Sequence, residues 1–67
     1  MKNFVKLLEN LDSGGAKVTF RKLDGSRRVM TCTWGDQGDC TDTYARVWDV
    51  ENRGYRTVRA DSIISVK

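Results

Sequence analysis

Residues 16–25 read AKVTFRKLDG and follow a pair of glycines at positions 14 and 15. Val18 and Phe20 alternate with polar residues, so the apolar side chains fall on one face at the two-residue period of a half-buried strand. Asp24 and Gly25 then form a strong hairpin signal, because both residues tolerate the positive φ of a tight turn. This stretch predicts the first strand and the turn of a β-hairpin.

Four further segments downstream of this turn have strand character. Residues 27–34 are rich in β-branched and large side chains but alternate poorly, so we expect a strand that is buried on both faces or bent by a bulge. Residues 44–50 show the strongest strand pattern, and residues 55–60 and 63–66 follow it after short turns. These segments predict five short antiparallel strands in meander order, which is the pattern of a small barrel.

Two connecting segments have a clear turn or loop composition. Residues 35–42 contain two glycines, three aspartates and no large apolar side chain, so we expect an exposed loop. In the turn at residues 51–54, Asn52 and Gly54 are available for left-handed backbone conformations. A single tight turn is expected at Asp61 and Ser62.

The segment before the two glycines has a different period. Phe4, Leu7, Leu8 and Leu11 recur at helical spacing, which predicts a short amphipathic helix over residues 3–11. We expect Asn3 to cap its N-terminus and residues 12–15 to end it. Because so short a segment is only marginally helical alone, the helix must lie on an apolar surface. The predicted fold is therefore mostly β, with a short N-terminal helix followed by a five-stranded small barrel.

The composition indicates one small globular domain covering residues 1–67. Hydrophobic residues make up 39% of the chain and charged residues 31%, which lies within the globular range. Twelve basic and nine acidic residues give a net charge of +3, which is compatible with nucleic-acid binding and with ordinary solubility alike. No signal peptide or membrane segment is recognisable, so we expect a cytoplasmic location and no membrane partner.

The sequence offers little for metal, cofactor or catalytic chemistry. Cys32 and Cys40 are expected to be free thiols in a reducing compartment, and with no histidine they cannot complete a four-ligand zinc site. Asp36, Asp39 and Asp42 carry oxygen ligands that suit Ca²⁺, but their spacing favours a solvated loop. Because no base stands near a nucleophile, we expect no enzyme activity and no cofactor.

Arginine residues gather at the last predicted hairpin, and seven of the twelve basic residues are arginine. Arg46 is flanked by Tyr44 and Trp48 on one strand face, and arginine beside aromatic rings is how small barrels hold single-stranded nucleic acid. Alternatively, Trp48 is a core residue, which we favour because a small chain needs its large aromatics inside, and Arg56 and Arg59 pair with Asp49 or Glu51. The candidate binding residues are Arg27, Arg28, Tyr44, Arg46, Arg53, Tyr55, Arg56 and Arg59.

Several motifs together resemble a known family. They are RVWDV at 46–50, GYR at 54–56 and DSIISV at 61–66, with VTFRKLDG at 18–25 and RVMT at 28–31 before them. This pattern is similar to small phage proteins with an Sm-like or SH3-like β-barrel related to the WYL domain. The resemblance covers residues 16–67 and implies that the predicted helix precedes an SH3-like/Sm-like barrel. It also implies a phage accessory protein that occupies a site on a host protein.

Two functions of different class follow from these observations. The favoured one is a small non-enzymatic phage accessory protein, in the host cytoplasm, that binds and modulates a host or viral protein. Sheet edges accept partner strands, and opposite charges at residues 36–42 and at the last hairpin would steer the encounter. The alternative is a nucleic-acid-binding small barrel that uses the arginines of the last hairpin.

Overall fold

The computed structural model describes residues 2–67 and consists of one helix, one short 3₁₀ helix and a sheet within that range. The elements in chain order are α1 (Lys2–Asp12), β1 (Ala16–Arg21), β2 (Arg27–Thr33), β3 (Asp39–Cys40), β4 (Tyr44–Asp49), β5 (Gly54–Arg59), η1 (Ala60–Ser62) and β6 (Ile63–Val66). All pairings are antiparallel, in the order β3-β4-β2-β1-β6, and β5 pairs with β4. The predicted mostly β fold with an N-terminal helix is confirmed.

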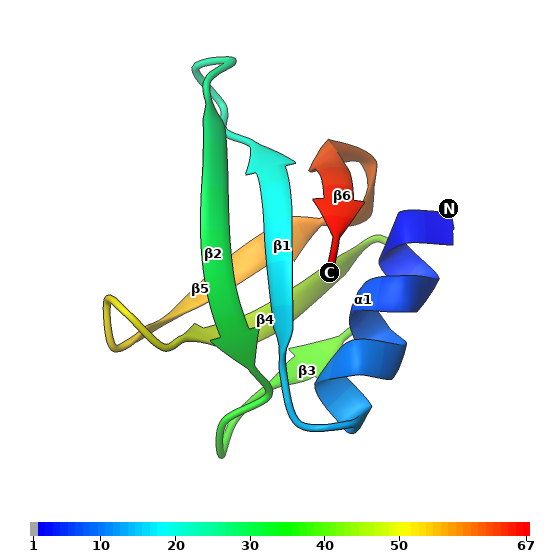
Figure 1. Ribbon diagram of the computed structural model, residues 1–67, viewed down its shortest axis with the longest axis vertical. Helices are drawn as coiled ribbons and strands as arrows, with labels where there is room; N and C mark the ends of the chain where they lie inside the picture. The colour runs from blue at the N-terminus through cyan, green and yellow to red at the C-terminus, as the bar shows by residue number, and fades with distance from the viewer. Residues whose placement is uncertain (1) are drawn as a thin grey trace.

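Strand β2 connects the β1–β2 hairpin to the β4–β5 hairpin, and the two hairpins cross each other. It pairs with β1 from Arg27 to Cys32, whereas only Cys32 and Thr33 pair with β4. The sheet therefore curls at the end of β2, and the β4–β5 hairpin crosses behind the β1–β2 hairpin in Figure 1. Within residues 2–67, β5 has no second strand partner, so the sheet forms a half-barrel that is open along β5.

Strand β2 matches neither of the two expectations for its poor alternation. Val29 is 54% exposed, so the strand is not buried on both faces, and the register between β1 and β2 runs without a shift. The core face carries Met30 and Cys32, and the apolar Val29 simply lies on the outer face. A single apolar side chain on the surface is normal in globular proteins, and here it obscured the two-residue period.

The irregular pairing occurs instead between β1 and β6. Thr19 lies opposite Ser65 and Phe20 lies opposite Ile63, which leaves Ile64 as an extra residue. The side-chain amide of Asn3 donates a hydrogen bond to the Ile64 carbonyl at 3.2 Å. Asn3 therefore lies inside α1 and satisfies the bulge, and the expected N-cap role is wrong because the helix already begins at Lys2.

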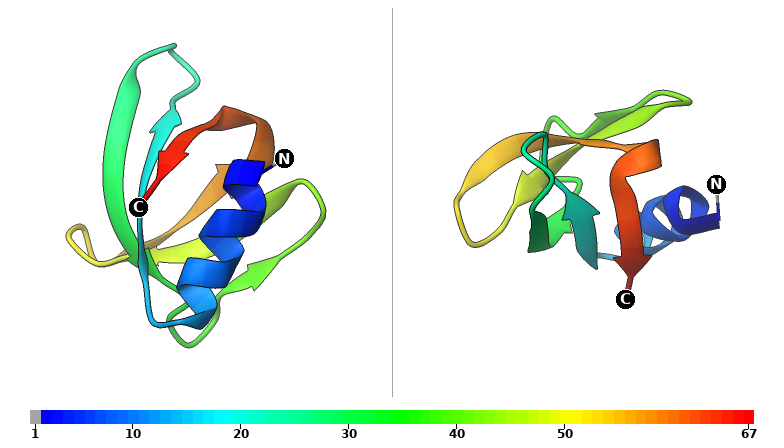
Figure 2. Two further views of the ribbon diagram at one scale, coloured as in Figure 1. Left: turned by 45° about the vertical axis from the view of Figure 1, so that its right-hand side comes forward. Right: turned by 90° about the horizontal axis from the view of Figure 1, so that it is seen from above.

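The core lies between α1 and the concave side of the sheet. Figure 2 shows α1 lying across the curled sheet beside β6, which provides the apolar surface that so short a helix needs. The buried apolar side chains are Phe4, Leu7, Leu11, Ala16, Val18, Phe20, Met30, Cys32, Ala45, Val47, Val58 and Val66. Gly14 ends the helix with a φ of 125°, and the Gly15 amide donates to the Asn10 carbonyl at 3.0 Å, as in a Schellman motif.

The β1–β2 turn is a three-residue loop rather than the expected two-residue turn. The Gly25 amide donates to the Lys22 carbonyl at 2.9 Å, and only Gly25 adopts a positive φ, of 91°. The Asp24 carboxylate instead accepts hydrogen bonds from the amide and the hydroxyl of Ser26, at 2.9 and 2.6 Å. A type I turn followed by a left-handed glycine explains why Asp24 needs no positive φ.

The β4–β5 turn assigns its left-handed residue differently from the prediction. Arg53 has a φ of 54°, whereas Asn52 and Gly54 do not have positive φ values. The Asn52 side chain instead donates to the Asp49 carboxylate at 2.8 Å, and the Arg53 amide donates to the Asp49 carbonyl at 2.8 Å. The turn is therefore organised around Asp49. The expected turn at Asp61 and Ser62 is the 3₁₀ helix η1.

The segment 35–42 is not wholly a loop. Asp39 and Cys40 pair with Arg46 and Ala45 to form the two-residue strand β3, so the described sheet has six strands instead of the predicted five. Two residues are too few to show a period of two, and the pairing uses backbone groups that any residue supplies. Cys40 is exposed and Cys32 is buried, and both are free thiols.

Candidate functional site

Two of the predicted binding arginines converge on a buried carboxylate. Asp49 is 1% exposed, and its Oδ2 lies 2.9 Å from Arg28 Nη2 and 3.5 Å from Arg56 Nε. The Asn52 side chain donates to Oδ2, while the amides of Glu51 and Asn52 donate to Oδ1 at 3.2 Å. The expected pairing of Arg56 with Asp49 is therefore present. We name Arg28, Asp49, Asn52 and Arg56 the Asp49 cluster.

The electrostatics of the Asp49 cluster are those of a structural site. Burial raises the pKa of Asp49, but hydrogen bonds from Asn52 and the charge of Arg28 outweigh it, so the pKa lies below its usual value. Burial and the Asp49 charge together raise the pKa of the neighbouring Cys32 thiol to about 11. At neutral pH Asp49 is therefore ionised and fully hydrogen-bonded, and Cys32 is a protonated thiol with little nucleophilic character.

The outer face of the β4–β5 hairpin carries the predicted arginine and aromatic residues. The Arg46 guanidinium lies 4.7 Å from the centroid of the Tyr55 ring, and Trp48 meets that ring edge-on at a centroid distance of 5.1 Å. The Tyr55 hydroxyl accepts a hydrogen bond from the Gln37 amide at 2.7 Å. Tyr55 is thus held by three contacts within the chain. Tyr44 is 42% exposed on the same face.

The favoured core position of Trp48 is wrong. Trp48 is half-buried on the outer face of β4, whereas the core face carries Ala45, Val47 and Asp49. Successive side chains of a strand point to opposite faces, so one strand cannot bury both Val47 and Trp48 in the same core. The large core side chains come from the helix and from other strands, among them Phe4, Leu7, Phe20 and Met30.

The remaining predicted arginines are distributed around the molecule. Arg59 pairs with Asp61 at 3.3 Å, with both side chains exposed, and not with Asp49 or Glu51 as expected. Arg27 opens β2 opposite Arg21 of β1, and Arg53 lies in the β4–β5 turn. The eight candidate residues therefore do not form one surface.

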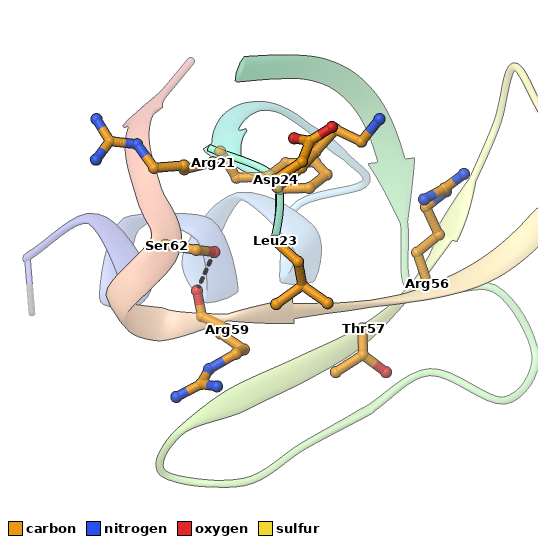
Figure 3. A pocket seen from close by; sticks show the side chains of 9 residues that line it. Arg21, Leu23, Asp24, Arg56, Thr57, Arg59 and Ser62 are labelled. Atoms are coloured by element: carbon orange, nitrogen blue, oxygen red, sulfur yellow. Dashed lines mark hydrogen bonds between the residues drawn. The ribbon is translucent and has the colours of Figure 1, made fainter. Parts of the chain in front are cut away.

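A shallow groove of about 420 Å³ lies along the open side of the half-barrel. One bank is the end of β1 and the following turn, the other bank is β5, and Ser62 of η1 stands at one end. Figure 3 shows Arg21, Arg56 and Arg59 spaced around this groove, with the Leu23 side chain directed toward β5 near Thr57. The residues that line it are Phe20, Arg21, Lys22, Leu23, Asp24, Arg56, Thr57, Arg59 and Ser62. We name this set the basic groove.

Sequence reasoning found only part of the basic groove. Arg56 and Arg59 were among the predicted residues, but Arg21, Lys22 and Leu23 were not. Leu23 carried a signal, because it is a large apolar residue in a turn of polar residues, and it is fully exposed in the structure. Arg21 and Lys22 carried none, since charged residues at the end of a strand are common on any soluble surface.

The described residues offer no metal centre. No group of three or more His, Cys, Asp or Glu side chains within residues 2–67 is arranged to hold a metal ion. The α1 and η1 helices of the same range lack the length and apolar character that a membrane crossing requires. The basic groove is the candidate site because cationic, apolar and strand-edge groups occur together in it.

Comparison with known proteins gives one match. A family model described as WYL_2, Sm-like SH3 beta-barrel fold, matches residues 4–64, which is nearly the whole chain. Searches of curated proteins and of solved structures found no match.

Proposed function

Because the chain belongs to the WYL_2 family of Sm-like SH3 β-barrels, we propose that it is a non-enzymatic accessory protein that binds and modulates a host or viral protein. The phage origin and the host cytoplasm as its location are part of this proposal, and both rest on the resemblance of residues 16–67 to small phage proteins. Small barrels carry many unrelated functions, so the site must supply the argument for this one.

The observation that carries the proposal is the composition of the basic groove. Arg21 and Lys22 on one bank and Arg56 and Arg59 on the other give it a positive rim, while Leu23 and Thr57 lie between them. A shallow groove with a charged rim and an exposed apolar side chain suits a protein segment, because the charges steer the partner and the apolar contact adds affinity.

Protein is favoured over nucleic acid because the predicted stacking residues already contact one another. The Arg46 guanidinium and Trp48 both pack against the Tyr55 ring, which leaves Tyr44 as the well-exposed aromatic side chain of this face. Stacking on several aromatics is the main sequence-tolerant contact of single-strand binders. The basic groove itself contains no exposed aromatic ring, since its only aromatic residue, Phe20, is buried in the core.

A binding role without chemistry is supported by the groove's titratable groups. Its carboxylate, Asp24, has a pKa below the usual value, because the side chain and the amide of Ser26 donate hydrogen bonds to it. A carboxylate held in its ionised form by such bonds is a poor general acid or base near neutral pH.

The experiment is affinity capture from bacterial lysate, with and without nuclease treatment, using the wild type and two variants of equal charge. Arg21→Glu/Lys22→Glu reverses one bank of the groove, and the control Lys6→Glu/Lys17→Glu reverses two exposed lysines elsewhere. Arg21 lies opposite Arg27 in the ladder, so its replacement by glutamate removes a like-charge pair and should not unfold the domain.

We expect one nuclease-resistant protein to be captured by the wild type and by the control, and to be lost with the groove variant. Capture that disappears after nuclease treatment would favour the nucleic-acid alternative. Equal capture by both variants would exclude the basic groove as the contact surface.

A further inference from the structure

We propose that the basic groove binds its partner by strand addition, in which an extended acidic segment of the partner pairs with the free edge of β5. This inference rests on the proposed function and names the kind of segment that the groove accepts. It follows from three features of the groove, namely its backbone groups, its charges and its exposed leucine.

The first feature is the direction of the β5 backbone groups. The Ala60 amide donates to the Thr43 carbonyl at 2.8 Å, so this opposed pair is of the hydrogen-bonded type. The type alternates along an antiparallel ladder, so Val58 and Arg56 also bond to β4, whereas Tyr55, Thr57 and Arg59 direct their backbone groups away from it.

Two further hydrogen bonds agree with this assignment. Tyr44, which lies opposite Arg59, uses its carbonyl to accept from the Thr41 amide, on the side of β4 away from β5. The Ser62 hydroxyl donates to the Arg59 carbonyl at 2.7 Å, which places that carbonyl on the outer edge of β5 (Figure 3). Ser62 thus covers the end of the edge, and within residues 2–67 the amides and carbonyls of Tyr55 and Thr57 have no hydrogen-bond partner on this side.

An open strand edge is a template for another strand, and proteins usually block it with proline, bulges or short length. Strand β5 has six residues without proline, and its register with β4 runs without a shift. The chain has no proline at all. Apart from Ser62 at its end, this edge is protected by charge, because Arg56 and Arg59 would repel a second copy that presented the same edge.

The second feature is the sign of the charge. Arg21, Lys22, Arg56 and Arg59 line the groove, against the one carboxylate of Asp24, which Ser26 already holds. Arg56 and Arg59 are partly neutralised by Asp49 and Asp61, but Arg21 and Lys22 form no ion pair within the described residues. The rim that repels a second copy therefore attracts an acidic segment.

The third feature is Leu23, which is fully exposed and points toward β5 across the groove. Side chains of an added strand alternate between the two faces, so a segment with alternating acidic and apolar residues would place its apolar residues on one side, toward Leu23. From Tyr55 to Arg59 the edge is about 13 Å long at roughly 3.3 Å per residue, which fits a segment of about five residues.

The test uses the acetylated and amidated peptide Glu-Val-Glu-Val-Glu, with Lys-Val-Lys-Val-Lys as the charge control. Two further peptides carry N-methyl groups on alternate amides, one on the glutamates and the other on the valines. Only one of these sets can face β5, so we expect one methylated peptide to bind at least about tenfold more weakly and the other to bind like the parent. The lysine peptide should not bind.

Amide hydrogen exchange supplies an internal control within β5. Bound peptide should slow exchange at Thr57 and Tyr55, whose amides point away from β4, and leave Arg56 and Val58 unchanged because β4 already protects them. The variant Thr57→Pro removes the outward amide and keeps the β4 ladder, since proline is tolerated on a strand edge. We expect it to lose binding, whereas Thr57→Val, which keeps the amide, should retain it.

Equal binding of both methylated peptides, or binding without slower exchange at Thr57, would overturn strand addition even if Thr57→Pro fails to fold. If the peptides fail but a captured protein still depends on Arg21 and Lys22, the proposed function stands and strand addition is wrong. If the peptides bind as expected but no nuclease-resistant protein is captured, the edge site stands and the proposed function is wrong.

Discussion

The Asp49 cluster and the basic groove place similar arginines in very different roles. In the Asp49 cluster, Arg28 reaches a carboxylate that is 1% exposed and hydrogen-bonded on both oxygens. In the basic groove, Arg21 forms no ion pair within residues 2–67 and lines the side of the groove formed by the end of β1. Arginine content is therefore a poor measure of binding surface in a small barrel, because burial of a single carboxylate engages two arginines.

The substitution Asp49→Ala should have the largest effect, because it removes the centre of the Asp49 cluster. This change leaves Arg28 without its partner and removes three hydrogen bonds that hold the β4–β5 turn. We expect the free energy of unfolding to fall by about 3 kcal/mol, since removal of one member of a buried ion pair leaves the other uncompensated. Urea denaturation followed by circular dichroism measures it. A loss below about 1 kcal/mol would mean that the cluster is not structural.

Low pH should also destabilise the Asp49 cluster, but by less than the Asp49→Ala substitution does. The folded-state pKa of Asp49 lies below the unfolded value of 3.8, so its stabilisation is present above that value and is lost as pH falls through the folded-state pKa. We expect stability to fall below about pH 4 more steeply in the wild type than in Asp49→Asn, which cannot titrate there. Parallel pH profiles of the two proteins would contradict this.

Arg28→Ala and Arg21→Ala compare the two regions directly. Arg28→Ala should lower the free energy of unfolding by about 2 kcal/mol, because a charged hydrogen bond to a buried carboxylate is lost. Arg21→Ala should change stability by less than about 0.5 kcal/mol, as is usual for exposed side chains. In peptide titrations the ranking of the two variants should reverse, because Arg21→Ala should lose more peptide affinity than Arg28→Ala. Similar stability losses in both variants would remove the distinction between the regions.

Arg53 belongs to neither region and should give the smallest effect. Its φ of 54° is costly for a residue with a side chain, and Gly relieves that cost while making the unfolded chain more flexible. We expect Arg53→Gly to raise the free energy of unfolding by about 0.5 kcal/mol, which raises the thermal midpoint slightly, and to leave peptide affinity unchanged. Weaker binding of the peptide would show that the β4–β5 turn contributes to the site.

Local patterns predicted the helix and the main strands well, because hydrophobic periodicity acts within a few residues. The helix, expected over 3–11, spans Lys2–Asp12, and the hairpin at 16–25 forms where the period predicted it. Among the failures were Asn3, β3 and Trp48. Asn3 depends on Ile64, a partner distant in the sequence, and β3 depends on backbone pairing that leaves no periodic signal. Trp48 was misplaced because its size was weighed above the alternation that gives the core face of β4 to Val47.

The sequence by itself determined that this chain is a mostly β fold behind an amphipathic helix, because alternation and helical spacing decide which faces become buried. Only the tertiary structure decided which arginines are engaged and which border an open edge. Arg28 and Asp49 are 21 residues apart, and they meet only because the sheet curls at the end of β2. The free edge of β5 likewise exists because β6 pairs with β1 instead of β5, a choice between strands that no single strand's residues express.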